Sequence, residues 1–128
     1  MKKVVTLIIV CLLVNCSNPS TNKKNMQNLI NNGTNTEPIF YTDNNFLFNG
    51  IIYNEDSSGN LIFEGYVKDG RFNGHYISRY KDRKLKVEGN YIDNKKDGLW
   101  EFSNYEGYLD SVIKYKMGDI EYIKRLGK

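Results

Sequence analysis

Alternation of apolar and polar residues is clearest over residues 85–92 and predicts a β-strand there. The apolar or small positions are Leu85, Val87, Gly89 and Tyr91, and the residues between them are polar. This is the two-residue period of a strand with one buried and one solvated face. The same alternation recurs over residues 61–67 and, more weakly, over residues 109–115. The chain is therefore expected to contain a series of strands.

A repeat of 24 residues relates these strands to one another. Residues 63–74 and residues 87–98 carry the same pattern of bulky, acidic and glycine positions at this spacing. Self-similarity at a fixed interval indicates stacked supersecondary units. The recurring positions are Gly50, Gly74 and Gly98, then Gly59, Arg83 and Gly107, then Gly70, Asn94 and Gly118. Glycine and asparagine reach positive φ at low cost, so the last two sets are predicted to be turns.

Two-residue turns at Asp69-Gly70 and Asp93-Asn94 would join neighbouring strands into antiparallel hairpins. Counting outward from these turns predicts four opposed pairs, which are Phe63 with Tyr76, Val87 with Trp100, Gly65 with Gly74, and Gly89 with Gly98. Counting from turns at Ser58-Gly59 and Asp82-Arg83 predicts two more, which are Ile52 with Gly65 and Tyr76 with Gly89. Glycines leave bare backbone on which an aromatic ring can lie. The sequence thus predicts an all-β fold, an elongated antiparallel meander of repeated hairpins.

The first copy of the repeat resembles a known motif. Its sequence at residues 63–74, Phe-Glu-Gly-Tyr-Val-Lys-Asp-Gly-Arg-Phe-Asn-Gly, is similar to a MORN repeat. The step Asp97-Gly98-Leu99-Trp100, with a bulky residue two places after the glycine, resembles the bacterial MORN-repeat variant, of which many members are labelled YwqK-type antitoxins. The resemblance covers about residues 46–124, and a third copy is degraded at residues 111–113. It implies MORN-like β-hairpins and brings no catalytic residues.

The N-terminus has the features of an export signal. A basic start at residues 1–3 precedes an apolar run at residues 4–14, which is too short to span a bilayer but suits a signal peptide. The run ends in Leu13-Val14-Asn15-Cys16, which is similar to a bacterial lipobox and implies lipid modification of Cys16 after removal of residues 1–15. Asn15 departs from the small residue that is usual at its position. An ordinary secretory leader and an uncut anchor are the alternatives.

These signals predict an exported protein that a lipid attaches to a membrane of the bacterial cell envelope. Residues 16–38, rich in Asn, Ser, Thr and Lys, are expected to form a flexible, disordered tether. The MORN-like β-repeat domain is expected over residues 39–126. It would begin with a hairpin of residues 39–41 and 46–48 that caps the first repeat, and end with a strand at residues 120–123.

A search of the sequence for catalytic or metal-binding groups finds none. Cys11 and Cys16, the two cysteines, lie within or at the end of the leader, so the domain has neither a disulfide framework nor a thiolate metal site. His75 is the one histidine, which excludes a histidine metal cluster. Glu64 and Glu88 suggest a carboxylate pair, but they occupy the same slot in successive repeats and are interpreted as structural. No catalytic residue, metal, cofactor or small-molecule substrate is predicted.

The charge balance bears on the class of partner. The chain has 18 Lys and Arg against 15 Asp and Glu, and loss of Lys2 and Lys3 with the leader leaves 16 against 15, a net charge of +1. A nucleic-acid-binding protein is expected to keep a concentrated basic face. The basic residues at 81–86 and 95–96 have acidic neighbours and lie around turns. They are interpreted as solvated edges, and no nucleic-acid partner is predicted.

Aromatic residues are numerous, with ten Tyr, six Phe and one Trp. They fit two interpretations, a recognition face and cross-strand packing that stiffens a thin sheet. Phe63, Val87 and Trp100 are assigned to packing. For four tyrosines on the other row or near turns both interpretations stay open, and these candidate binding residues are Tyr66, Tyr80, Tyr105 and Tyr108.

The sequence therefore predicts a membrane-anchored, non-catalytic protein-interaction module. The alternative is an antitoxin or immunity-type protein that neutralises a partner toxin, as the family label implies. The partner is accordingly expected to be an envelope protein or a toxin. Binding to lipid headgroups, which eukaryotic MORN proteins suggest, receives little electrostatic help from the near-neutral charge of the mature chain.

Overall fold

The computed structural model describes residues 22–127 of the chain. The predicted signal peptide (residues 1–15), the lipobox and Cys16 lie outside the described residues. The described part contains a short 3₁₀ helix, η1, at Met26–Asn28. Its strands are β1 (Lys23–Asn25), β2 (Ile30–Asn31), β3 (Phe40–Tyr41), β4 (Gly50–Glu55), β5 (Leu61–Lys68), β6 (Arg71–Arg79), β7 (Leu85–Ile92), β8 (Lys95–Ser103), β9 (Leu109–Lys116) and β10 (Asp119–Arg125).

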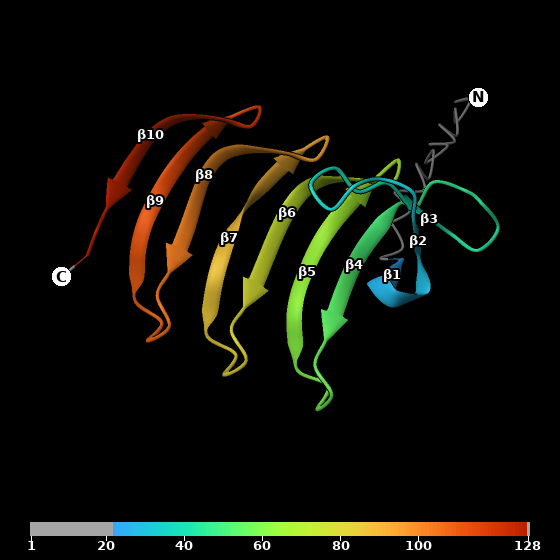
Figure 1. Cartoon of the computed structure of the whole chain (residues 1–128), viewed down its shortest axis with the longest axis horizontal. Coiled ribbons are helices and arrows are strands. Elements are labelled where there is room, and N and C mark those ends of the chain that lie inside the picture. The colour runs from blue at the N-terminus through green and yellow to red at the C-terminus, as the bar shows by residue number, and fades with distance from the viewer. Residues whose placement is uncertain (1–21, 128) are drawn as a thin grey trace, which may run out of the picture.

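Eight of these strands form one sheet in the order β1-β4-β5-β6-β7-β8-β9-β10. From β4 to β10 each strand pairs antiparallel with the next one in sequence, so the sheet is a long meander (Figure 1). β1 departs from this order because it lies parallel to β4 at the N-terminal edge. The predicted all-β fold, an elongated antiparallel meander of hairpins, is confirmed.

Two kinds of turn alternate along the meander, one kind at each end of the sheet (Figure 1). At one end, both central residues of Asp69-Gly70, Asp93-Asn94 and Met117-Gly118 have positive φ, which defines mirror-image type I′ turns that match the twist of a hairpin. At the other end, each loop places one residue in the left-handed region. These residues are Gly59, Arg83 and Gly107, with φ of 79°, 71° and 93°. Both kinds of turn lie where the repeat spacing predicts them.

The register inside the hairpins differs from the prediction. Val67 pairs with Phe72, as the turn requires, but Gly65 then pairs with Tyr76 instead of Gly74. β6 thus carries two residues more than β5 here, and the extra stretch includes Gly74 with a φ of 121°. Such a bulge favours a residue that tolerates positive φ, and β8 repeats it around Gly98. The predicted pairs that are wrong for this reason are Phe63 with Tyr76, Val87 with Trp100, Gly65 with Gly74, and Gly89 with Gly98.

The register predicted across the other loops is correct. Ile52 pairs with Gly65, and Tyr76 pairs with Gly89. The two glycines leave space for the rings beside them. A Cβ atom on Gly65 would lie 3.1 Å from Cδ2 of Tyr76, and a Cβ atom on Gly89 would overlap the indole of Trp100. Close packing of aromatic side chains therefore requires glycine at both positions.

Residues 22–38 belong to the folded domain, so the predicted flexible tether over residues 16–38 is wrong for the part that the structure describes. β1 adds a parallel edge strand to β4, and η1 and β2 follow it. Met26 and Leu29, which are too sparse in the sequence to indicate a buried face, pack against the core of the first repeat. The sheet supplies the apolar surface that this segment lacks on its own.

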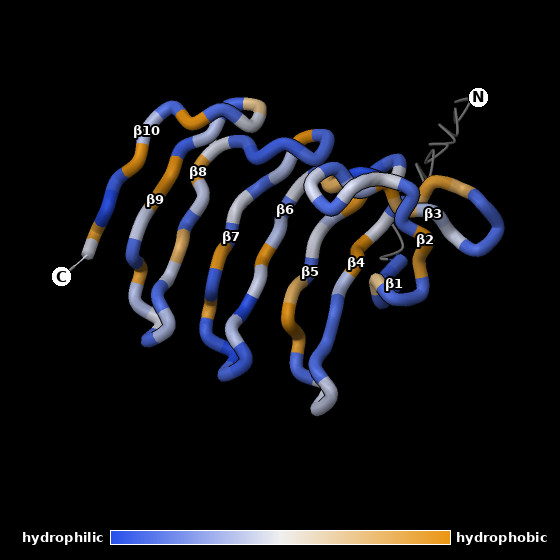
Figure 2. The backbone as a smooth tube through the Cα atoms, viewed as in Figure 1, coloured by the Kyte–Doolittle hydropathy of each residue, from blue (hydrophilic) through white to orange (hydrophobic). Residues whose placement is uncertain are grey.

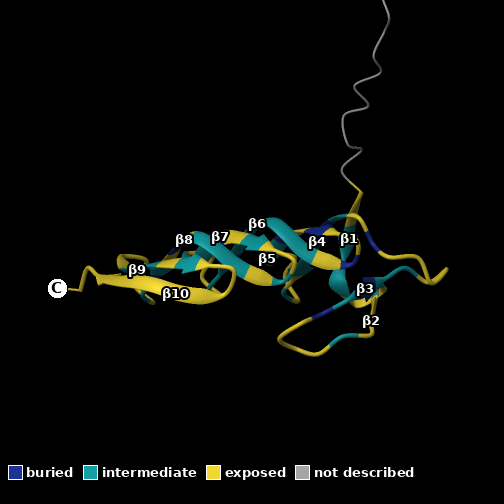
Figure 3. Ribbon diagram, turned by 90° about the horizontal axis from the view of Figure 1, so that it is seen from above, coloured by how far each residue is buried: buried dark blue, intermediate teal, exposed yellow. Residues whose placement is uncertain are grey.

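The predicted hairpin at the start of the domain forms and covers the first repeat. Its two sides meet where the N–H group of Phe48 donates to the carbonyl of Phe40 at 2.9 Å. Phe40 and Phe48 are almost fully buried and form the core cluster with Ile52 and Val67. Residues 26–48, which we call the N-terminal arm, lie against one face of the sheet at its β4 end (Figure 3).

Beyond the arm the sheet is a single layer (Figure 3). Apolar and polar residues alternate along the strands (Figure 2), and successive side chains point to opposite faces of the sheet. The rings that contact one another on one side form what we call the aromatic face, which consists of Phe63, Phe72, Tyr76, Tyr91, Trp100, Phe102 and Tyr115. The opposite face, which we call the polar face, carries ion pairs of Lys23 with Glu64 and of Lys114 with Glu121, and a contact of His75 with Glu88.

Candidate functional site

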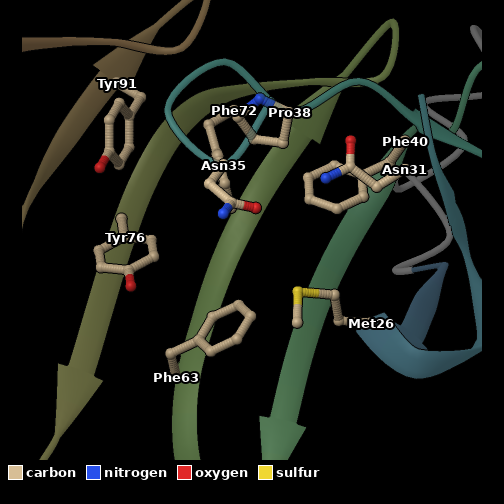
Figure 4. Close-up of a pocket in the computed structure, with 9 residues that line it drawn as sticks. All are labelled: Met26, Asn31, Asn35, Pro38, Phe40, Phe63, Phe72, Tyr76 and Tyr91. Carbon is tan, nitrogen blue, oxygen red and sulfur yellow. The ribbon is translucent and has the colours of Figure 1, made fainter. Parts of the chain in front are cut away.

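A groove with a volume of about 460 Å³ lies between the N-terminal arm and the aromatic face (Figure 4). The arm contributes Met26, Asn31, Asn35, Pro38 and Phe40, and the sheet contributes Phe63, Phe72, Tyr76 and Tyr91. The two groups of residues are far apart in the sequence. The groove therefore exists because the arm folds back over strands β4 to β7.

Aromatic contacts fix the sheet side of the groove. Phe63 stacks on Tyr76 with 5.9 Å between ring centroids, and Phe72 stacks on Tyr91 at 5.3 Å. Phe72 also meets Tyr76 edge-on at 5.6 Å and an interplanar angle of 89°. Stacked and edge-on pairs at these distances are the favoured arrangements of aromatic rings. The rings thus hold one another in place and form a wall that exists before any ligand arrives.

Asn94 fastens the arm over this wall. Its side-chain Nδ2 donates to the carbonyl of Pro38 at 2.8 Å, and its Oδ1 accepts from the N–H group of Phe72 at 2.8 Å. Within the arm, Oδ1 of Asn31 accepts from the N–H group of Ile39 at 3.0 Å. Asn94 was predicted as a turn residue and has a φ of 65°. It therefore combines a turn with a long-range link that the turn alone does not require.

The lining of the groove is neutral but not wholly apolar. None of its nine residues carries a charge. The Asn35 amide and the Tyr91 hydroxyl make no hydrogen bond to another side chain or backbone group of residues 22–127, and Figure 4 shows both among the side chains that surround the opening. An aromatic wall beside unpaired amide and hydroxyl groups suits a neutral ligand with an apolar part and a hydrogen-bonding edge.

Burial perturbs the two tyrosines of the groove. Burial raises the pKa of Tyr91 to about 12, and the nearby Tyr76 and Tyr115 add to the shift. Burial likewise raises the pKa of Tyr76. A group whose pKa is raised by folding stabilises the fold fully below its unfolded pKa, which is about 10 for tyrosine. That contribution is lost as the pH rises through the folded value.

We therefore expect the free energy of unfolding to fall between about pH 10 and pH 12. Near neutral pH, ionisation of Tyr91 should not make the stability depend on pH. Urea unfolding followed by circular dichroism at stepped pH measures the effect. Tyr91→Phe removes the ionisable hydroxyl and should flatten the decline. Tyr105→Phe, at a position 61% exposed, is the matched control and should leave the decline unchanged. An equal decline in wild type and Tyr91→Phe would contradict the assignment to Tyr91.

A second cluster lies farther along the aromatic face. Nζ of Lys96 lies 4.7 Å from the ring centroid of Trp100, 5.3 Å from that of Phe102 and 5.1 Å from that of Tyr115. Burial lowers the pKa of Lys96, while the three ring faces attract its charge. The aliphatic stem of a lysine in such a place covers apolar surface. Lys96 thus helps to shield Trp100, which is 1% exposed.

The two repeated glutamates lie on the polar face and have separate partners. Glu64 accepts from Nζ of Lys23 at 2.6 Å, and Glu88 contacts Nε2 of His75 at 2.7 Å. Both glutamates pair with Ile77 from opposite sides of β6, so two strand spacings, about 10 Å, separate their backbones. The separate partners of Glu64 and Glu88 and the distance between them fit the interpretation that this repeated glutamate is structural.

The four tyrosines left open by the sequence do not gather at one place. Tyr80 and Tyr105 lie at the loop end of the sheet with 4.8 Å between ring centroids, and the hydroxyl of Tyr80 donates to the carbonyl of Ser103 at 2.9 Å. Tyr105 and Tyr108 are each 61% exposed. Tyr66 is 41% exposed and pairs with Ile51 of β4, away from those loops. The structure thus brings Tyr80 and Tyr105 together and leaves Tyr66 apart.

Sequence reasoning did not identify any residue of the groove as a binding residue. Asn31 and Asn35 fall in the segment predicted to be a tether, and Tyr76 and Tyr91 were considered for their place in the strands. The spacing of Tyr76 and Trp100 at one repeat was an available signal for the aromatic face. No local pattern marks the arm that closes the groove.

Residues 22–127 contain no group of three or more His, Cys, Asp or Glu side chains placed to hold a metal ion. Within the same part of the chain, no helix has the length and apolar character needed to cross a membrane. Comparison with protein-family models, with curated proteins and with solved structures found no match.

Proposed function

We propose that the protein is a non-catalytic interaction module that binds a partner protein through the groove between the N-terminal arm and the aromatic face. A lipid on Cys16 attaches the module to a membrane of the bacterial cell envelope, and the partner is another envelope protein. The chain would then belong with the bacterial MORN-repeat variant, which the step Asp97-Gly98-Leu99-Trp100 resembles, while residues 63–74 resemble a MORN repeat.

The groove is the observation that carries this proposal. Its aromatic wall is held by ring contacts, and its roof is fastened by Asn94 through Pro38. A preformed site avoids the ordering cost that a flexible surface pays on binding. Amide and hydroxyl groups beside the wall would orient the partner, and an apolar wall with a few polar groups is the common composition of binding sites.

A short stretch of polypeptide fits this composition. An apolar side chain of the partner would lie against Phe63 and Tyr76, while its backbone N–H and C=O groups would meet the amides of Asn31 and Asn35. A charged ligand would lose its hydration in a neutral groove without gaining a counter-charge, which is costly. The lining therefore favours a neutral peptide segment.

The test blocks the groove without disturbing the fold. Asn35→Trp places a bulky ring at a lining position that is exposed and makes no side-chain hydrogen bond within residues 22–127. Asn44→Trp, at an exposed position in the loop of the cap hairpin, is the matched control because residue type and substitution are the same. Each full-length variant serves as bait in a crosslinking pull-down from the membrane fraction.

The expected result is a protein that wild type and Asn44→Trp recover and that Asn35→Trp loses by at least about tenfold, as expected for removal of a central contact. Equal recovery by all three baits would overturn the groove as the binding site. Growth arrest by the recovered protein, relieved on co-expression with this chain, would identify the partner as a toxin. Intact-mass measurement of the membrane fraction, with and without signal peptidase II inhibition, tests the lipid on Cys16.

A further inference from the structure

The sheet ends in an open strand. β10 is the last strand in the sheet order and pairs with β9 on one side only. All seven of its residues are exposed, including Ile120 and Ile123 at 54% and 51%. A long exposed edge presents unpaired N–H and C=O groups and is a template for pairing with another strand.

The N-terminal half of β10 is acidic and its C-terminal half is basic. Asp119 and Glu121 come first, and Lys124 and Arg125 follow. Edges that avoid pairing carry charges that repel an incoming strand. A second copy of β10 aligned antiparallel would instead place its basic half against the acidic half of the first. A parallel copy would set like charges side by side, so the antiparallel arrangement is favoured.

We propose that β10 is a self-association edge, through which two copies of this chain pair antiparallel and extend one continuous sheet. One register pairs both the opposite charges and the isoleucines. It sets Asp119 opposite Lys124, Ile120 opposite Ile123, and Glu121 opposite Tyr122, each twice about a two-fold axis. Two oppositely charged pairs and two apolar pairs then form together, and each kind of pair stabilises an antiparallel ladder.

The bulge in β10 makes this register consistent with the two faces of the sheet. Ile120 pairs with Tyr115 and Ile123 pairs with Ile113, and the register shifts between Ile120 and Tyr122. In a regular strand, residues three apart lie on opposite faces. The extra residue returns Ile123 to the face of Ile120, so both isoleucines continue the aromatic face toward the second copy.

The ion pairs already present leave the required charges available. Glu121 is bound to Lys114 of the same sheet at 3.0 Å. Asp119 and Lys124 belong to no salt bridge within residues 22–127. Neither of the two charges that the register joins between copies therefore has a salt-bridge partner within residues 22–127 of one copy.

The contact is small, because a single seven-residue strand meets its copy. Interfaces at the low end of the size range are weak and reversible. We therefore expect a monomer–dimer equilibrium that depends on concentration over the range of roughly 1–100 µM. The groove lies at the opposite end of the sheet, so this inference does not rest on the proposed function.

Charge reversal tests the register. Sedimentation equilibrium of the full-length chain in density-matched detergent measures the association. Asp119→Lys alone and Lys124→Asp alone each create two like-charged pairs and should weaken association at least about tenfold. An equimolar mixture of the two variants should associate as wild type does, because each crossing pair again joins an acid to a base. Asp43→Lys, at an exposed site in the cap hairpin, is the control and should not change association.

Circular dichroism confirms that each variant is folded before it is measured. Wild type that stays monomeric at about 100 µM would overturn the proposal. So would a mixture that fails to associate, since it would show that Asp119 and Lys124 do not face each other between copies. Equal association of wild type and both single variants would place the contact elsewhere on the chain.

Discussion

Replacement of Gly89 by valine is expected to destabilise the protein by about 3 kcal/mol, at the upper end of the range for overpacking. A Cβ atom at this position would overlap the indole of Trp100, which lies across the strand and is 1% exposed. The indole has little freedom to retreat, because Tyr76 stacks on it with 6.0 Å between ring centroids. For a domain of this size the loss corresponds to a fall in melting temperature of roughly 10–20 °C, measured by circular dichroism.

Gly127→Val is the control for this prediction. A Cβ atom on Gly127 would have no atom within 4 Å, so the melting temperature should change by less than about 2 °C, as for surface substitutions. A Gly89→Val protein that melts with wild type would show that the Trp100 ring does not lie over the glycine. The sequence alone predicts that Tyr76 lies opposite Gly89. The structure assigns the closest contact to Trp100.

Truncation of the Trp100 ring itself is expected to destabilise the protein more than Gly89→Val does. Trp100→Ala removes an almost fully buried indole, its edge-on contact with Tyr91 at 4.8 Å, and a hydrogen bond from Nε1 to the carbonyl of Asn90 at 3.0 Å. Loss of a buried tryptophan costs about 3–5 kcal/mol. Urea unfolding followed by circular dichroism is the suitable measurement, because Trp100 is the one tryptophan of the chain.

Trp100→Phe keeps a ring over Gly89 and should cost less than half as much as Trp100→Ala. A double-mutant cycle with Gly89→Ala then tests the contact between the two positions. Gly89→Ala should be destabilising in wild type and nearly neutral in the Trp100→Ala background, with a coupling of at least about 1 kcal/mol. Additive effects of Gly89→Ala and Trp100→Ala would contradict the contact.

The repeat spacing was sufficient to predict the fold because turns and strands carry local signals. Asp69-Gly70 and Asp93-Asn94 supply residues that reach positive φ, and the alternating runs between them supply the strands. The register within the hairpins was not predictable by counting from these turns. Gly74 and Gly98 were interpreted as pairing positions, whereas each belongs to a bulge that adds two residues to one strand.

One further recurring position of the repeat was not recognised from the sequence. Asn49 and Asp97 precede the recurring glycines by one residue, and the side-chain oxygen of each accepts a hydrogen bond from the next turn. The donors are the N–H groups of Asp69 and Met117, at 2.9 Å and 3.0 Å. The recurrence was present in the sequence. Its meaning depends on which turn lies beside which strand, and that follows only from the sheet.

The groove was beyond prediction for a different reason. Met26 and Leu29 show no periodicity, because η1 and β1 are three residues long and β2 is two residues long. The hydrogen bond from Asn94 to Pro38 joins residues 56 positions apart. Hydrogen bonds between residues so far apart leave no local sequence pattern. A segment with the composition of a polar linker can therefore still close a groove.

The single-layer sheet determines where unfolding of the protein begins. Each strand from β5 to β9 touches two neighbours in the same sheet, whereas β10 touches one and has no covering layer. In such a linear array, cooperative unfolding begins where contacts are fewest and spreads inward. The molecule should therefore fray from its C-terminal hairpin, while the strands under the capped N-terminal end persist longest. Whatever protects β10 would thus govern the lifetime of the whole array.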